Sequence, residues 1–135
     1  ANIFGIGIAT VIPAENLAEV LDLYIPILDL RIVSLAALFL GCGFIGLHPV
    51  VVVLTLGAIL SPETMGLRDW VLGLVFLGCW GLTTMVSPYS GTTLIMSRFT
   101  GIASHVIGWR WAPLSVLFNA ALMIAFIIAL RHATL

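Results

Sequence analysis

A cluster of hydroxyl side chains interrupts one of the long apolar segments of this sequence. Six Ser and Thr residues and one Tyr fall within eleven positions: Thr83, Thr84, Ser87, Tyr89, Ser90, Thr92 and Thr93. Hydroxyl oxygens, with the carbonyl oxygens of an unwound helix, can ligate a sodium ion without any net charge. The pattern therefore predicts a substrate or ion site here, with a candidate sodium position near Ser87, Ser90 and Gly91.

Pro88 stands at the centre of this cluster and favours a helix break, because proline cannot donate a backbone hydrogen bond. Thr92 and Thr93 would begin the next half-helix, where free amides and the helix dipole favour an anion. Small polar residues then recur at helical spacing: Thr93, Ser97, Thr100 and Ser104. The alternative is a proline kink whose freed backbone groups are satisfied by Ser and Thr hydroxyls.

A second interruption lies between Gly41 and Pro49. It contains the pattern Gly-x-Gly-x-x-Gly, followed by His48. A dinucleotide-binding fingerprint requires a preceding strand, whereas the flanks here are apolar helix, so that interpretation is excluded. We expect a loop at the tip of a helical hairpin, with Gly43, Gly46 and His48 near the site. Helix packing through small residues, and a histidine hydrogen-bonded between helices, are the alternatives.

Other chemistries fit this sequence poorly. Ser87 or Ser90 with His48 could form a catalytic triad only with an aspartate, and every aspartate lies in a loop or interfacial segment. No second pair of histidines and no haem signature accompanies His48 and His105. A net charge of −1 without any lysine argues against nucleic-acid binding. We therefore expect neither an enzyme nor a resident cofactor, apart from a sodium ion.

The composition indicates which elements must position these residues. The chain is 61% hydrophobic and 8% charged. A soluble domain carries about 25% charged residues, so this chain has too few to cover a surface that faces water. The free cysteines Cys42 and Cys79 both lie inside apolar runs. The sequence predicts an all-α integral membrane protein whose main partner is the lipid bilayer.

Two of the three long apolar segments are interrupted near their centres. Residues 32–60 would form about 43 Å of helix and residues 70–108 about 58 Å, whereas the hydrocarbon core is roughly 30 Å thick. Non-helical backbone at membrane depth is tolerated where it lines a protein cavity. We predict a broken, re-entrant hairpin over 31–60, a discontinuous transmembrane helix over 70–108 and a plain final transmembrane helix over 113–130.

The N-terminal part of the chain differs from these segments. Residues 1–13 are apolar but too short to span, so we predict the end of a truncated helix. Residues 14–30 alternate acidic and apolar residues, as expected for an amphipathic linker at the interface. Trp109-Arg110-Trp111 marks a second interface. We expect the C-terminal part of a longer protein, or else a small membrane protein that has been processed.

This order of elements resembles the C-terminal half of the ion-transporter superfamily, over roughly residues 14–130. Members include divalent anion/sodium symporters, citrate carriers and the large permease subunits of TRAP transporters. Gly46-Leu47-His48-Pro49 and the following 50–60 look like the hairpin tip and its returning arm. Gly-Leu-His stands where that family has a Ser-Asn-Thr-type tip. The residues 86–92, Val-Ser-Pro-Tyr-Ser-Gly-Thr, look like the family's unwound motif.

The resemblance implies an elevator-type transport domain, coupled to sodium or protons, that carries small anionic solutes, often carboxylates. It also implies a missing N-terminal repeat of the same protein, a homo-oligomer and a bacterial inner membrane. The substrate or ion site would comprise Gly43, Gly46, His48, Thr84, Ser87, Pro88, Ser90, Gly91, Thr92 and Thr93. The alternative function is a non-transporting membrane subunit whose helix breaks are only packing kinks.

Overall fold

The computed structural model describes residues 14–134, and these form helices and short connections without any strand. The predicted all-helical fold is confirmed for this range. Three helical stretches are long and apolar enough to cross a membrane: Leu28–Ile45, Asp69–Thr100 and Ser104–Ala133. The helix end predicted within residues 1–13 lies outside the described range.

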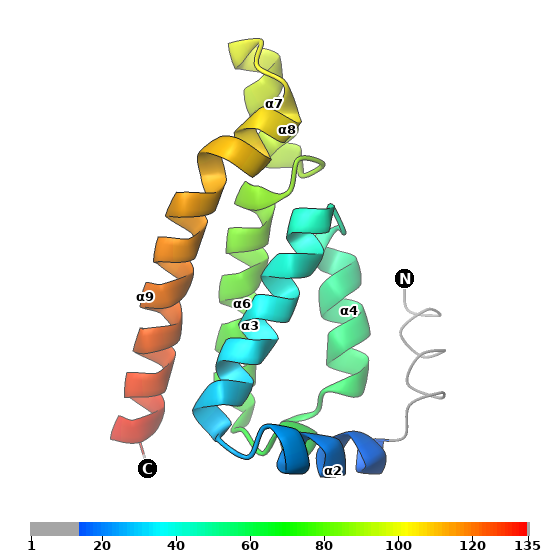
Figure 1. Ribbon diagram of the computed structural model, residues 1–135, viewed down its shortest axis with the longest axis vertical. Coiled ribbons are helices and arrows are strands. Elements are labelled where there is room, and N and C mark those ends of the chain that lie inside the picture. Colours follow the sequence, from blue (N-terminus) through cyan, green and yellow to red (C-terminus); the bar gives the residue numbers. More distant parts are fainter. Residues whose placement is uncertain (1–13, 135) are drawn as a thin grey trace.

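Helix α2 (Ala14–Tyr24) lies across the base of the molecule, and the other long helices rise from this end (Figure 1). The buried Arg31 side chain connects the elements that meet at this base. It donates hydrogen bonds to the carbonyl oxygens of Ile25, at 2.8 Å, and Met65, at 3.0 Å, and it pairs with Asp22. Arg31 thus ties α2 and the single turn α5 (Pro62–Met65) to the start of α3.

The predicted hairpin corresponds to two antiparallel helices, α3 (Leu28–Ile45) and α4 (Pro49–Ile59). At ~1.5 Å per residue the arms are about 27 Å and 16 Å long. Both arms have their outer ends at the base, and the tip lies between them at residues 46–48 (Figure 1).

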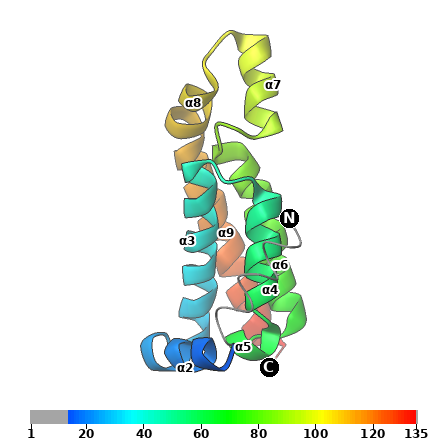
Figure 2. The same ribbon diagram turned by 90° about the vertical axis from the view of Figure 1, so that its right-hand side faces the viewer.

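The interrupted helix rises from the base as α6 (Asp69–Val86) and continues as α7 (Gly91–Thr100). It ends earlier than the predicted residue 108. Gly101 adopts a left-handed conformation, with φ of +71°, which terminates α7. Ser104 therefore lies on the next helix and does not continue the polar stripe of α7. Figure 2 shows that α7 and α8 project beyond the hairpin tip.

The last helical unit returns to the base. It begins with the short α8 (Ser104–Val106) and one turn of π-helix, η1 (Ile107–Trp111), and then runs as α9 (Ala112–Ala133). Helix α9 is three residues longer at its C-terminal end than the predicted 113–130. The core lies between α3, α6 and α9, with α4 packed on its side, and includes the fully buried Ile32, Ala36, Phe39, Val71, Val75 and Cys79.

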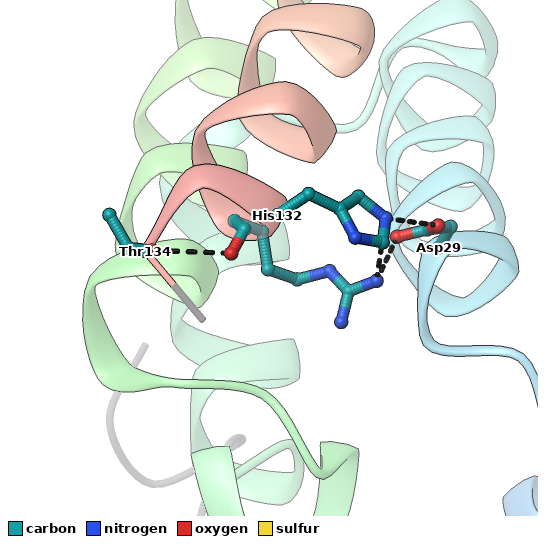
Figure 3. A network of polar contacts seen from close by, with 4 residues as sticks. Asp29, His132 and Thr134 are labelled. Atoms are coloured by element: carbon teal, nitrogen blue, oxygen red, sulfur yellow. Dashed lines mark hydrogen bonds and ion pairs between the residues drawn. The ribbon is translucent and has the colours of Figure 1, made fainter.

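A polar cluster joins the base of α3 to the end of α9 (Figure 3). One carboxylate oxygen of Asp29 lies 2.5 Å from the Arg131 guanidinium, and the other lies 3.1 Å from Nε2 of His132. Arg68, just before α6, donates to the carbonyl oxygen of Thr134 at 2.9 Å. These contacts hold the three long helices together at one end of the bundle.

Candidate functional site

The hairpin tip turns because Gly46 adopts a left-handed conformation, with φ of +102°, at the end of α3. The Leu47 amide donates to the carbonyl oxygen of Cys42 at 3.0 Å, which satisfies the last turn of the helix. Pro49 then begins α4, and the His48 ring caps this helix by accepting from the Val50 amide at 3.3 Å. The His48 side chain is otherwise exposed at the tip.

The break in the second helix is held by the hydroxyls of its own residues. Ser90 caps α7 by accepting from the Thr93 amide at 3.2 Å, and its hydroxyl donates to the carbonyl oxygen of Thr84 at 2.5 Å. The Thr93 hydroxyl donates to the carbonyl oxygen of Ser87 at 2.7 Å. The side chains of Ser87, Ser90 and Thr93 are all at least 97% buried. Hydrogen bonds inside the break therefore replace those that the interrupted helix lost.

These bonds use some of the oxygen atoms near the predicted sodium position at Ser87, Ser90 and Gly91. The carbonyl oxygen of Ser87 accepts from both the Ser90 amide, at 3.2 Å, and the Thr93 hydroxyl. The carbonyl oxygen of Ser90 accepts from the Leu94 amide at 3.0 Å and lies 3.1 Å from the Thr93 hydroxyl. The single proton of the Thr93 hydroxyl goes to the Ser87 carbonyl, whose two lone pairs are then used, while the Ser90 carbonyl keeps one lone pair. The sodium position near Ser87, Ser90 and Gly91 stays a prediction.

The structure brings the hairpin tip against the break. A Cβ built at Gly46 would lie 2.5 Å from Cδ2 of Tyr89, so the tyrosine ring packs directly on the glycine. One turn earlier in α3, a Cβ built at Gly43 would lie 2.1 Å from Cγ2 of Thr83. Both contacts require glycine, because any larger side chain would overlap the partner. The two interruptions of the sequence thus meet in space through residues from separate segments.

The π-helical turn η1 closes this region from a third side. A Cβ built at Gly108 would lie 2.7 Å from the carbonyl oxygen of Val86, so the turn packs against the backbone of the break. The Trp109 indole N–H donates to the carbonyl oxygen of Phe44 at 2.8 Å, and its ring stacks on the Phe44 ring, with centroids 6.1 Å apart. Single π-turns of this kind are frequent at functional sites.

These contacts also show where the two interruptions lie along the length of the bundle. Residues 111–130 carry no charge and make about 30 Å of helix, which matches the hydrocarbon thickness. Because the tip and the break both contact η1, they lie at the Trp109–Trp111 end of this apolar length. We predicted both interruptions near the middle of a span, and the difference arises because α3 and α6 are each about 27 Å long before they end.

Some of the predicted site residues remain accessible. Gly91 and Thr92 are exposed at the start of α7, and within the described chain their amides have no hydrogen-bond acceptor. His48 and Tyr89 are exposed at the same end, and the Tyr89 side chain is 64% accessible. These groups can donate hydrogen bonds to an anion, with the dipole of α7 in favour.

A groove of about 240 Å³ opens beside this exposed edge. Residues of α6, α7, η1 and α9 line it, including Met85, Thr92, Met96, Trp111 and Ser115. A solute that hydrogen-bonds Thr92 would lie at its mouth, with apolar walls on the far side.

The ten predicted residues therefore fall into three groups. Ser87, Pro88, Ser90 and Thr93 are buried inside the break, and Thr84 donates to the carbonyl oxygen of Gly81 at 2.7 Å within α6. Gly43 and Gly46 are packing positions. His48, Gly91 and Thr92 are accessible.

The site predicted from the sequence omitted the residues that join the segments, namely Thr83, Tyr89, Gly108 and Trp109. Tyr89 stood inside the hydroxyl cluster, which was a signal that could have identified it. Within residues 14–134 no group of three His, Cys, Asp or Glu residues is placed to hold a metal ion. Comparisons with protein-family models, curated proteins and solved structures found no match for this chain.

Proposed function

We propose that this chain is part of a secondary active transporter for a small anionic solute, with a carboxylate as the favoured class. The observation that carries the proposal is the contact between the hairpin tip and the helix break, with Tyr89 packed on Gly46. Secondary transporters build their sites where interrupted helices meet, since free backbone amides are available there. A protein with only a packing role needs no such convergence.

In this proposal the solute binds at the accessible edge of the junction. The amides of Gly91 and Thr92 and the positive end of the α7 dipole would hold the anion. His48 at the hairpin tip and Tyr89 at the break would contact the same solute from either side. Sodium or proton coupling would drive transport, with the candidate sodium position near Ser87, Ser90 and Gly91.

The proposal extends to the whole assembly. The remaining half of the site would come from an N-terminal repeat of the same protein, in a homo-oligomer of the bacterial inner membrane. The hairpin and the interrupted helix would move as one body, in elevator fashion. The contacts of Gly43 with Thr83 and of Phe44 with Trp109 support such joint movement, because they tie the hairpin to both α6 and η1.

The second candidate is a non-transporting membrane subunit whose breaks are packing kinks. The hydrogen bonds of Ser90 and Thr93 favour it, because these buried hydroxyls satisfy only their own backbone. The two candidates differ in whether the exposed edge binds a solute.

Cysteine labelling in membrane vesicles tests this difference. In a background with Cys42→Ser and Cys79→Ala, we expect Thr92→Cys and His48→Cys to react with a membrane-impermeant maleimide. Succinate, citrate, lactate and inorganic phosphate are then tested as protecting anions. The anion that binds should slow labelling of both positions about threefold at twice its Kd, since one third of the sites would be free.

Phe99→Cys is the matched control, because Phe99 lies on the same helix and is 84% exposed but far along α7 from the junction. It should react at the same rate with and without anions. If Thr92→Cys and His48→Cys are unreactive, or if no anion protects them, the transport proposal fails and the packing-kink candidate holds.

A further inference from the structure

An apolar groove of about 300 Å³ lies between α3 and α9, distinct from the groove beside Thr92. Its lining includes Ala37, Gly41 and Phe44 of α3 and Pro113 and Val116 of α9. Phe44 belongs to the last turn of α3, and Pro113 is the second residue of α9. The groove therefore lies at the Trp109–Trp111 end of the bundle, and no charged residue lines it.

The charged residues of α7 and η1 are both arginines, Arg98 and Arg110. All six acidic residues precede Trp70, so Arg98 and Arg110 have no acidic residue after Asp69 to neutralise them. Within residues 14–134 Arg110 forms no ion pair, and it is exposed. It stands three residues before Pro113, on the π-helical turn that leads into α9 at this end of the groove.

Trp109 and Trp111 flank Arg110, and both side chains are partly exposed. Tryptophan side chains collect where hydrocarbon meets the headgroup layer. A phospholipid has two parts, a phosphate and a hydrocarbon chain. The Arg110 guanidinium at the headgroup level suits the phosphate, and the apolar groove between α3 and α9 suits the chain.

We propose that the α3–α9 groove holds one acyl chain of an anionic phospholipid, with the headgroup phosphate on Arg110. The guanidinium donates paired hydrogen bonds to the phosphate oxygens, while the chain covers the apolar walls. The wholly apolar lining suits a hydrocarbon chain. This inference is independent of the transport proposal.

Thermal unfolding of the whole chain in detergent micelles tests the inference. Phosphatidylglycerol is added at roughly ten times its Kd, and phosphatidylcholine is added in parallel. We expect phosphatidylglycerol to raise the Tm by about 5 °C and phosphatidylcholine to raise it far less.

Two variants remove the two parts of the site separately. Gly41→Leu fills the groove, because a Cβ built at Gly41 meets no other part of the described chain within 4 Å. The Cβ of the new side chain therefore has open space beside the groove, and leucine is a better helix former than glycine. Arg110→Gln removes the charge. Both variants should lose most of the Tm increase given by phosphatidylglycerol.

The matched controls are Gly73→Leu, at another open helical glycine, and Arg98→Gln, at the other arginine of this end. Both should keep the wild-type response. Equal stabilisation by the two lipids would overturn the proposal, as would a wild-type response in Gly41→Leu and Arg110→Gln. A change of oligomeric state in Gly41→Leu with an unchanged lipid response would assign the groove to a second copy of the chain instead.

Discussion

At Gly108 the absence of a side chain allows the last helical unit to cross the interrupted helix. A Cβ built there would lie 2.7 Å from the carbonyl oxygen of Val86 and 3.1 Å from the Pro88 nitrogen. Both atoms belong to the backbone of the break, so neither can move without disturbing the hydrogen bonds of Ser87 and Ser90. Single glycines of this kind decide how closely the segments approach.

We predict that Gly108→Ala lowers the free energy of unfolding by about 1–3 kcal/mol, because overpacking against a fixed backbone forces the segments apart. Gly81→Ala is the matched control, since a Cβ at that helical position meets no other part of the described chain within 4 Å. It should raise stability by up to about 1 kcal/mol through helix propensity. Chemical unfolding in detergent micelles measures both, and an equal effect of the two variants would contradict the close approach.

On the scale of the elements, α6 and α7 behave as two helices joined by a hydrogen-bonded turn. Pro88 removes one donor, and Ser90 starts the second helix as its cap. Thr93 reaches back to the carbonyl oxygen of Ser87, across the turn, from a position only 2% exposed. The hydroxyls thus determine the geometry with which α7 leaves the end of α6.

Thr93→Val keeps the shape of this side chain and removes the bond across the turn. We expect it to lower the free energy of unfolding by about 0.5–1.5 kcal/mol, the usual net value of one hydrogen bond, because the Ser87 carbonyl keeps its bond from the Ser90 amide. Thr92→Val serves as the control, because Thr92 is exposed and its hydroxyl makes no hydrogen bond within residues 14–134. Its effect on stability should stay within about 0.5 kcal/mol. The hydrogen-bonded turn would be refuted by similar losses in both variants.

The charged residues lie at the two ends of the molecule. Arg31, Arg68 and Arg131 lie at the base with Asp22 and Asp29, where they form ion pairs and hydrogen bonds between the helices. The opposite end carries Arg98 and Arg110, which form no ion pair among the described residues, together with the hairpin tip and the break. The outer ends of both hairpin arms, the start of α6 and the end of α9 all lie at the base (Figure 1).

This arrangement predicts the sidedness of labelling. In the cysteine-free background, Glu63→Cys and Thr134→Cys should react with an impermeant maleimide from the same side of sealed vesicles. Arg98→Cys should react only from the opposite side. Labelling of inside-out and right-side-out vesicles distinguishes the two sides of the membrane. If Glu63→Cys and Arg98→Cys react from the same side, the hairpin topology is excluded.

Much of the fold can be predicted from the sequence, because it depends on neighbouring residues. Helix formation and termination depend on nearby residues, so Gly46, Pro49 and Pro88 mark the tip and the break by their residue types alone. The apolar composition likewise restricts the chain to helices, because only a helix satisfies the backbone of an isolated segment in lipid. The predicted end of the interrupted helix was wrong because residues 70–108 were treated as one segment, although Gly101 with Arg98 in the turn before it is a typical helix C-terminus.

Both helix breaks, and the residues at each break, can be predicted from the sequence, since they are properties of neighbouring residues. The tertiary structure brings the two breaks together, because Tyr89 on Gly46 and Thr83 on Gly43 are contacts between distant segments. It also decided that Ser90 and Thr93 use their hydroxyls inside the break, while Thr92 beside them stays exposed. A hydroxyl can satisfy its own backbone or a ligand, and only the surrounding geometry selects between them.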